Sequence, residues 1–350
     1  MRRRNLILGL LGFAVMGTAH AQQNGKVHRI AIVDPALPTA EFTDAKSHAG
    51  WKAFYDELRR LGYIEGQNLL IERYSGEGRA FHYPDLARDV VHRNPDVIFA
   101  ITTELTLDFK AATTTIPIVG VFSYPIETGI VPSLAHPGGN VTGAAYEASH
   151  LWLKRLEVFH EMVPQAIRVG YLTRRELRET WEAQGRPGDE VARKMGVSVI
   201  AASLDHPMDE AAYRRVFVGL TQDHADGFMV HEDEENLTNR KLIIELAEKN
   251  RLPAIYPWKM AVDDGGRMSY GTDLAVLGRR VADTVDQILK GRKPRDIPVF
   301  QPTKFELAIN LKTAKALGVA RADWAIYRCR RADRVAAFAA LHESVVDAVE

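Results

Sequence analysis

The sequence has one cysteine in 350 residues, no excess of charge of either sign and only one long uncharged apolar run. Because a disulfide needs two cysteines, Cys329 cannot form one within the chain. Lys plus Arg (45) equals Asp plus Glu (45), which gives no electrostatic reason to expect nucleic acid binding. Hydrophobic residues make up 46% and charged residues 26%, as in ordinary globular proteins. The length suits two α/β lobes better than one core.

The apolar run near the N-terminus has the features of an export signal. Arg2 to Arg4 precede it, the run extends from Leu6 to Gly17, and Ala19-His20-Ala21 is a small-x-small cleavage site. A membrane anchor is the alternative, but a span needs about 20 apolar residues and this run is shorter. We therefore predict cleavage after Ala21 and a periplasmic chain. Loss of the three arginines leaves 42 basic against 45 acidic residues.

Motifs for catalysis and cofactor binding are absent as well. The sequence contains no G-x-x-x-x-G-K-[ST] loop, no G-x-S-x-G elbow, no H-E-x-x-H zinc motif and no G-x-G-x-x-G after the first predicted strand. That strand ends in Asp34-Pro35, and proline lacks the N–H group that a pyrophosphate would need. Cys329 lies outside the predicted strand ends and is poorly placed as a nucleophile. We predict no enzyme activity, no cofactor and no metal.

Beyond residue 26 the chain alternates short β-rich runs with amphipathic helices. Residues 27–33 are nearly continuously apolar after Arg29, which is typical of a parallel strand buried on both faces. A helix follows, with one apolar stripe made of Trp51, Phe54, Tyr55, Leu58 and Leu61. Further strands are predicted at 68–72, 97–101, 116–122 and 141–145, and helices at 83–92 and 105–112. This order predicts a doubly wound parallel sheet.

The alternation restarts after residue 150. Helices are predicted at 151–162, 176–195, 208–220 and 237–249, and strands at 168–172, 197–202, 227–230 and 254–256. Two successive β/α runs predict an α/β protein with two doubly wound parallel-sheet lobes, a hinge and a cleft between them. A helix is also predicted at 274–289 and a strand at 305–311. Periodicity alone does not assign these two elements, or the segment 268–270, to either lobe.

Polar and aromatic residues gather just beyond the predicted strand ends, where open α/β sheets bind ligands. The candidate ligand-binding residues are Thr102, Thr103, Ser123, Tyr124, Thr173, Asp233, Tyr256 and Trp258. Asp34, Arg174 and His231 occupy the same kind of position. Hydroxyls, charged groups and aromatic faces could enclose a small polar or zwitterionic solute. Taken singly, each residue also suits a cap or a surface position, so their recurrence carries the prediction.

The densest acidic run, from His231 to Glu235, has two interpretations. It could bind a metal or a cationic ligand. Alternatively, Glu234 and Glu235 lie in a solvated loop and favour the start of the next helix. We favour the solvated loop for these two glutamates and keep Asp233 as a ligand-binding candidate.

Several segments resemble motifs of the ABC-transporter substrate-binding proteins of the tryptophan/tyrosine type. They are LGYIEGQN at 61–68, TGIVPSLAHPGGNVTG at 128–143, RLPAIY at 251–256, GGRMSYG at 265–271, QPTKFEL at 301–307 and INLKTAKALG at 309–318. The resemblance implies a type I periplasmic-binding fold with several hinge crossings. It also implies a small solute, favouring an amino acid, held between closing lobes and delivered to a separate permease and ATPase. A monomer is expected.

The resemblance also sets the expected domain boundaries. We expect a signal peptide at 1–21, a first lobe at 22–144 plus 268–300, a second lobe at 145–267 plus 301–319 and an atypical tail at 320–350. In this scheme residues 268–291 return to the first lobe.

Three departures from the family pattern stand out. Tyr124-Pro125 replaces Asp-Pro, so a phenol stands where the family has a carboxylate. His231-Glu232-Asp233-Glu234 replaces L-P-D-P but keeps the aspartate. After Val319 the chain departs altogether, as a frameshifted ending or an extra terminal helix would.

Rival functions follow from the same sequence. A ligand sensor on the same scaffold would present its solute to a receptor. An exported α/β hydrolase or transferase would turn its solute over, and the missing nucleophile and metal motifs argue against it. A degraded copy, suggested by the tail, would fold poorly.

Overall fold

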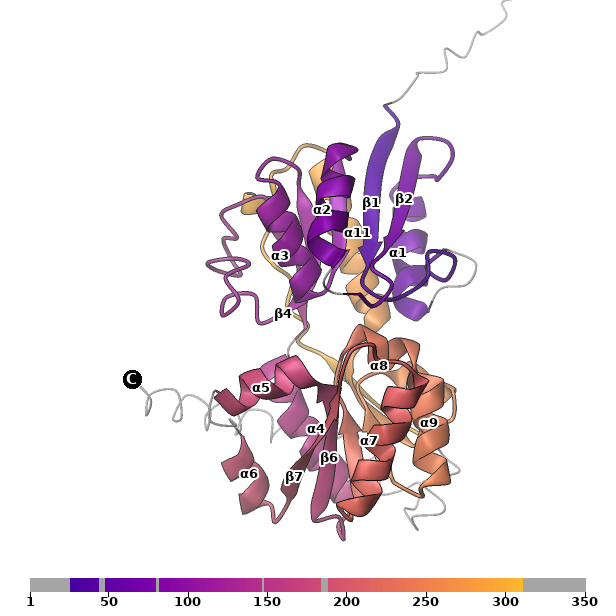
Figure 1. The fold of residues 1–350 in the computed structure, drawn as a ribbon. Coiled ribbons are helices and arrows are strands. Elements are labelled where there is room, and N and C mark those ends of the chain that lie inside the picture. The colour runs from indigo at the N-terminus through magenta and orange to yellow at the C-terminus, as the bar shows by residue number, and fades with distance from the viewer. Residues whose placement is uncertain (1–25, 44–47, 80–81, 147, 184–187, 311–350) are drawn as a thin grey trace, which may run out of the picture.

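The structure is a computed structural model that describes residues 26–43, 48–79, 82–146, 148–183 and 188–310. The described chain forms two lobes, each built on its own sheet, and Figure 1 shows them end to end. The predicted signal peptide and the atypical tail lie outside the described residues. No helix in the described part of the chain is both long enough and apolar enough to cross a membrane.

The first lobe contains a five-stranded sheet of order β2-β1-β3-β4-β5, and every pairing in it is parallel. Its strands are β1 (His28–Asp34), β2 (Leu69–Ser75), β3 (Val97–Ile101), β4 (Ile118–Ser123) and β5 (Val141–Tyr146). Its helices are α1 (Ala49–Arg60), α2 (Tyr83–His92), α3 (Thr103–Ala112) and, from much later in the chain, α11 (Leu274–Leu289). Helices α1 and α11 cover one face, and α2 and α3 cover the other.

The second lobe contains a six-stranded sheet of order β11-β10-β9-β8-β6-β7, with β11 antiparallel at one edge. Its strands are β6 (Arg168–Arg174), β7 (Ser198–Leu204), β8 (Gly227–Val230), β9 (Ala254–Tyr256), β10 (Met268–Thr272) and β11 (Phe305–Ile309). Its helices are α4 (Ala148–Met162), α5 (Arg175–Ala183), α6 (Asp189–Lys194), α7 (Glu210–Gln222), α8 (Glu234–Thr238), α9 (Arg240–Lys249) and α10 (Lys259–Asp263). The two α/β lobes confirm the predicted fold class.

One expected domain boundary is wrong. Residues 268–272 form β10, which pairs in parallel with β9 of the second sheet and not with the first lobe. Every residue of β10 is buried, so the run needed a sheet partner on each side, and β11 supplies the other. The chain therefore crosses to the first lobe after Thr272, where α11 begins.

Two predicted helices are broken. The segment predicted as one helix at 176–195 contains α5 and α6, and Gly188, with a φ of 90°, precedes α6. The helix predicted at 237–249 is preceded by the short α8, and a break at Asn239 separates α8 from α9. Helix α10 was not predicted.

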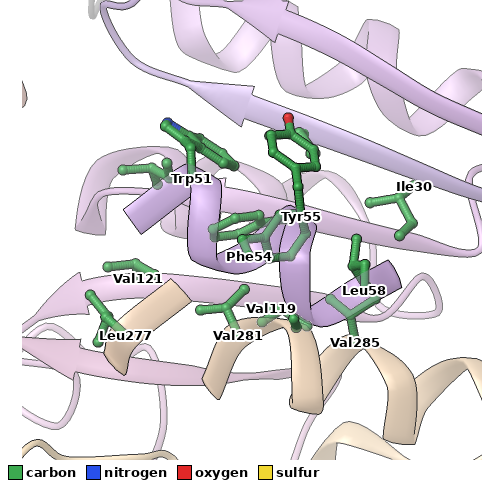
Figure 2. Close-up of a cluster of buried hydrophobic side chains, with 14 of the residues drawn as sticks. Ile30, Trp51, Phe54, Tyr55, Leu58, Val119, Val121, Leu277, Val281 and Val285 are labelled. Atoms are coloured by element: carbon green, nitrogen blue, oxygen red, sulfur yellow. The ribbon is translucent and has the colours of Figure 1, made fainter. Parts of the chain in front are cut away.

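Helix α1 packs directly against α11, and this contact forms the centre of the first lobe. Figure 2 shows Phe54 and Leu58 of α1 above Val281 and Val285 of α11, with sheet residues beside them. Glycines allow the helices to approach closely. A Cβ added to Gly278 would lie 2.1 Å from the backbone oxygen of Gly50, well inside contact distance.

The described chain crosses between the lobes three times. It passes from β5 to α4, from β10 to α11, and from Phe300 to β11. Before the third crossing, Phe300 adds to the edge of the first sheet: its N–H donates to the Gly143 oxygen (2.9 Å) and its oxygen accepts from Ala145 (2.8 Å). Three such crossings are the connections about which hinge closure occurs in two-lobed binding proteins.

Substitution of Gly278 by alanine is expected to lower stability by about 2 kcal/mol or more, because the added methyl must push α11 away from α1. Chemical denaturation measures this. Gly219→Ala on α7 is the matched control, since nothing lies within 4 Å of its added Cβ. The control should be neutral or stabilising by about 0.5–1 kcal/mol. Equal effects of the two substitutions would contradict the close helix contact.

Candidate functional site

The carboxyl ends of the two sheets meet at the junction between the lobes. Leu237 of α8 and Trp258 belong to the second lobe in sequence but lie in the buried apolar cluster of the first. An ion pair also joins the lobes, from the Arg174 Nη2 at the end of β6 to the Glu104 Oε1 of α3 at 3.0 Å. In Figure 1, α8 lies at the end of the second lobe that faces the first. The structure is therefore that of a closed form.

Arg174 connects the charged groups at this junction. Besides Glu104, its Nε donates to the Asp233 Oδ1 at 2.8 Å, and the His231 Nδ1 lies 3.2 Å from that same oxygen. Burial alone would raise the pKa of Asp233, but His231 and Arg174 hold it well below its usual range. Burial likewise lowers the pKa of His231, and Asp233 more than reverses this, so the net shift is upward. Asp233 is thus an ionised carboxylate whose charge is offset by Arg174 and His231.

A second buried ion pair joins Arg155 of α4 to Glu232. The Arg155 side chain is completely buried, its Nε donates to the Tyr270 oxygen at 3.0 Å and its Nη1 donates to the Val230 oxygen at 3.4 Å. Burial raises the pKa of Glu232, but Arg155 beside it produces a net lowering. This arginine therefore connects the end of β8 to the middle of β10 and holds Glu232, which follows β8, in place.

The first lobe contributes Asp34, at the end of β1. Its Oδ1 accepts from the Ala36 N–H at 2.9 Å and the Leu37 N–H at 2.7 Å. Its Oδ2 is buried and has no hydrogen-bond partner among the described residues. Burial raises the pKa of Asp34 to about 7, against the lowering effect of the two N–H groups, and Glu235 of the other lobe raises it further.

Glu234 and Glu235 face Asp34 from the first turn of α8. They are only 6% and 9% exposed, so the interpretation of these glutamates as a solvated loop is wrong. Burial raises the pKa of Glu234 well above its usual value, and the charges of Asp34 and Glu235 raise it further. The pKa of Glu235 is also raised, by burial and then by Asp233.

An aromatic group lies beside these charges in the second lobe. Tyr171 of β6 stacks on Trp152, with ring centroids 6.1 Å apart, and meets the His231 ring edge-on at 5.8 Å. Burial raises the pKa of Tyr171, and the Glu232 carboxylate adds to the shift. Aromatic faces next to buried charges are typical of small-molecule sites.

The predicted residues at the ends of β3 and β4 are partly used in local structure. Thr102 has a φ of 85°, and its Oγ1 accepts from the Leu105 N–H at 3.5 Å as the cap of α3. The Thr103 Oγ1 exchanges two 3.0 Å hydrogen bonds with the backbone of Ser123. Tyr124 follows with a φ of 51°. The structure brings these four residues together, on the first lobe's side of the junction.

The predicted residues of the second lobe separate into two groups. Asp233 and Trp258 lie at the junction, and Thr173 is buried at the end of β6 with no partner for its Oγ1 among the described residues. Tyr256 packs in the second lobe's core, where Glu248 and Arg267 are the charges that act on its hydroxyl. Those two residues lie near the end of α9 and just before β10, away from the carboxyl ends of the strands, so the structure does not support a ligand contact from Tyr256.

Sequence analysis missed Glu104, Arg155 and Tyr171. Arg155 had a readable signal, because it falls on the apolar stripe of α4 with Leu151 and Phe159, and a charge on such a stripe is typical of a buried ion pair. Glu104 and Tyr171 had none. The described residues contain no cluster of three or more His, Cys, Asp or Glu side chains suited to a metal ion.

Comparison with known proteins identifies the family. The family profile described as ABC transporter substrate binding protein matches residues 44–329. The chain belongs to this family. A tyrosine-binding protein of Clostridioides difficile is 26% identical over 269 residues, covering 76% of this chain and 75% of that protein.

Solved structures show the same fold for this substrate-binding protein. A conserved domain protein of Vibrio cholerae has a TM-score of 0.72 at 24% identity, and an L-Trp complex from Streptococcus pneumonia has 0.71 at 21%. Each comparison covers 84% of this chain and 96% of the solved one. At this level of identity the likeness establishes the two-lobed fold.

Closure of the ligand-free protein is expected to depend on pH. Asp34, Glu234 and Glu235 have raised pKa values in the closed form and regain solvent when the lobes separate. The closed form therefore binds more protons, so lowering the pH from 8 to 5 should shift the population toward it. The other charged groups acting on these carboxylates are Asp233, Arg174, Arg240 and His206, and Asp34 and Glu235 in turn act on the Tyr83 hydroxyl.

Small-angle X-ray scattering tests this, with a smaller radius of gyration expected at pH 5 than at pH 8. The Asp34→Asn/Glu234→Gln double variant should show a flatter response, with circular dichroism to check that both proteins remain folded. A radius that is independent of pH, or larger at pH 5, would contradict the expected linkage.

Proposed function

We propose that this protein is the extracytoplasmic solute-binding component of an ABC importer, which captures a small solute between its lobes and delivers it to a permease. The observation that carries the proposal is the enclosed junction itself. Charged, hydroxyl and aromatic side chains from both lobes converge at the carboxyl ends of the sheets, and three chain crossings connect the lobes as a hinge. The family and the tyrosine- and tryptophan-binding relatives support an amino acid or a similar small solute.

The mechanism is a shift between open and closed forms. A solute drives closure only through its greater affinity for the closed form. The direct ion pair between the lobes, Arg174 to Glu104, is partly solvated, with 21% and 41% of the side chains exposed, and such a pair contributes about 1 kcal/mol or less. The buried carboxylates oppose closure at neutral pH. A bound solute is therefore the main force that closes the lobes.

The ligand contacts that we propose are Thr102, Thr103, Ser123, Tyr124, Thr173, Asp233 and Trp258. Asp34, His231 and Tyr171 join them because the structure places them in the same junction. In this role the protein performs no chemistry. Arg155 and Arg174 position strand ends and carboxylates, and no nucleophile activated by a base is needed.

The same proposal covers location and partners. The signal peptide at 1–21 would export the chain to the periplasm, where it acts as a monomer with the permease and ATPase as separate chains. A sensor on the same scaffold would lack those partners, so neighbouring reading frames for a permease and an ATPase distinguish importer from sensor.

Native mass spectrometry of residues 22–350 as purified should reveal a stoichiometric small-molecule adduct. A solute present at 100 times its dissociation constant adds about 2.7 kcal/mol to the free energy of unfolding. This should raise the Tm by about 5 to 10 °C. The adduct should remain chemically unchanged over hours. Conversion of the bound solute would instead favour the exported hydrolase or transferase.

Glu104→Gln is expected to weaken solute binding by up to about fivefold, mainly through faster dissociation, because it removes the ion pair between the lobes. Glu65→Gln is the matched control. Glu65 pairs with Arg73 inside the first lobe and has similar exposure, 44%. Calorimetry and stopped-flow dissociation compare the two variants. An equal loss of affinity in both would remove Glu104 from the closing mechanism.

A further inference from the structure

The junction between the lobes contains more carboxyl groups than basic side chains that form ion pairs with them. The arginines there are already engaged: Arg155 pairs with Glu232, and Arg174 pairs with Asp233 and Glu104. His231 also faces Asp233. After these pairs are formed, three buried carboxylates have no ion-pair partner among the described residues. They are Asp34, Glu234 and Glu235.

These three carboxylates come from opposite sides of the junction. Asp34 ends β1 in the first lobe, and Glu234 and Glu235 begin α8 in the second. Leu237, in the same short helix as the two glutamates, packs in one buried cluster with Leu37, which follows Asp34 by three residues. In keeping with this contact, Glu235 raises the pKa of Asp34, and Asp34 raises that of Glu234. A nearby base, Arg240 of α9, already pairs with Asp264 at 2.7 Å. His48, the other basic group near Arg240, is kept neutral because burial lowers its pKa to about 4.

Asp34 supplies an independent sign of a missing partner. Its side chain is 0% exposed, and its Oδ1 is fully used by two N–H groups. Its Oδ2 has no donor among the described residues. A buried carboxylate oxygen without a donor is strongly unfavourable, and a positively charged donor satisfies it best.

The chemistry of the donor set narrows the class of partner. The described residues offer no cluster suited to a metal ion, so an organic cation fits better. Because Arg155 and Arg174 are committed to carboxylates, no free guanidinium remains among the described junction residues to balance an acidic group on the solute. A zwitterion such as tyrosine brings no net charge, and the surplus would persist.

We propose that the solute of this protein carries a net positive charge, and that its ammonium or guanidinium group binds between Asp34 and the Glu234–Glu235 pair. The inference rests on the proposed binding function and specifies its ligand class. An ammonium group has three donors and a guanidinium five, enough to reach both lobes at once. The cation thus offsets the repulsion that opposes closure, which links recognition to closing.

Matched pairs of solutes test the charge requirement. Arginine and citrulline, lysine and norleucine, and tyramine and tyrosine are similar in shape, but only the first member of each pair has a net positive charge. Calorimetry at pH 8 should show at least one cation binding at least tenfold tighter than its partner. Asp34→Asn and Glu234→Gln should each weaken the binding of that cation at least tenfold. Each should also reduce the ratio of affinities between the two members of the pair.

Glu65→Gln is again the control variant, because Glu65 is an exposed carboxylate that precedes β2, whereas the junction lies at the carboxyl ends of the strands. It should bind the cation like the wild type. The amide that Asp34→Asn introduces keeps an oxygen for the Ala36 and Leu37 N–H groups, so circular dichroism and the ligand-free Tm should show an intact fold.

The outcomes separate this inference from the proposed function. If a neutral or zwitterionic solute binds as tightly as the cations and Asp34→Asn has no effect, the charge requirement is overturned while the binding function stands. A panel in which no cation binds also overturns it. If a bound solute is chemically converted, the proposed function itself fails.

Discussion

Closing the two lobes brings Asp34 of the first against Glu234 and Glu235 of the second, and none of these carboxylates has a cationic partner among the described residues. Like charges in a buried site repel strongly and must be protonated or offset. Nearby bases relieve this only in part: Arg240 acts on Glu234, and Arg174 and His206 act on Glu235, but both arginines form their ion pairs with other carboxylates. A positively charged group at the junction therefore stabilises the closed form more than the open form. In the proposed mechanism, this difference in affinity drives closure.

The rest of the fold holds this junction in place. The close contact between α1 and α11 makes the first lobe rigid up to the crossing after Thr272, and Arg155 ties together the strand ends of the second. Rigid lobes joined by three short crossings leave the hinge as the main freedom of the described chain. In the proposed mechanism, a change in charge at the junction shifts the balance between open and closed lobes, because packed sheets resist deformation.

Much of the fold could be predicted because local sequence determines it. Continuous apolar runs marked β3 at 97–101, and amphipathic stripes marked α2 at 83–92 and α11 at 274–289, with bounds that the structure confirms. The sheet partner of β10 could not be predicted, because a strand buried on both faces carries no pattern that determines which strands pair with it. The resemblance placed it in the wrong lobe.

The site was less predictable, because its properties arise from the contact between lobes. Strand-end position correctly suggested Asp34 and Asp233 as junction residues. It could not show that Asp233 is neutralised while Asp34 is not, because that depends on Arg174 and His231 across the sheet. A run of acidic residues before a helix is normally solvated, but Glu234 and Glu235 are buried at the junction, where α8 contacts the first lobe.

The most direct test of the account is a crystal structure of the closed, solute-loaded protein at pH 8. The account predicts an ammonium or guanidinium nitrogen within about 3 Å of the Asp34 Oδ2, in reach of Glu234 as well. A closed structure with a neutral group or only water between these carboxylates would contradict it.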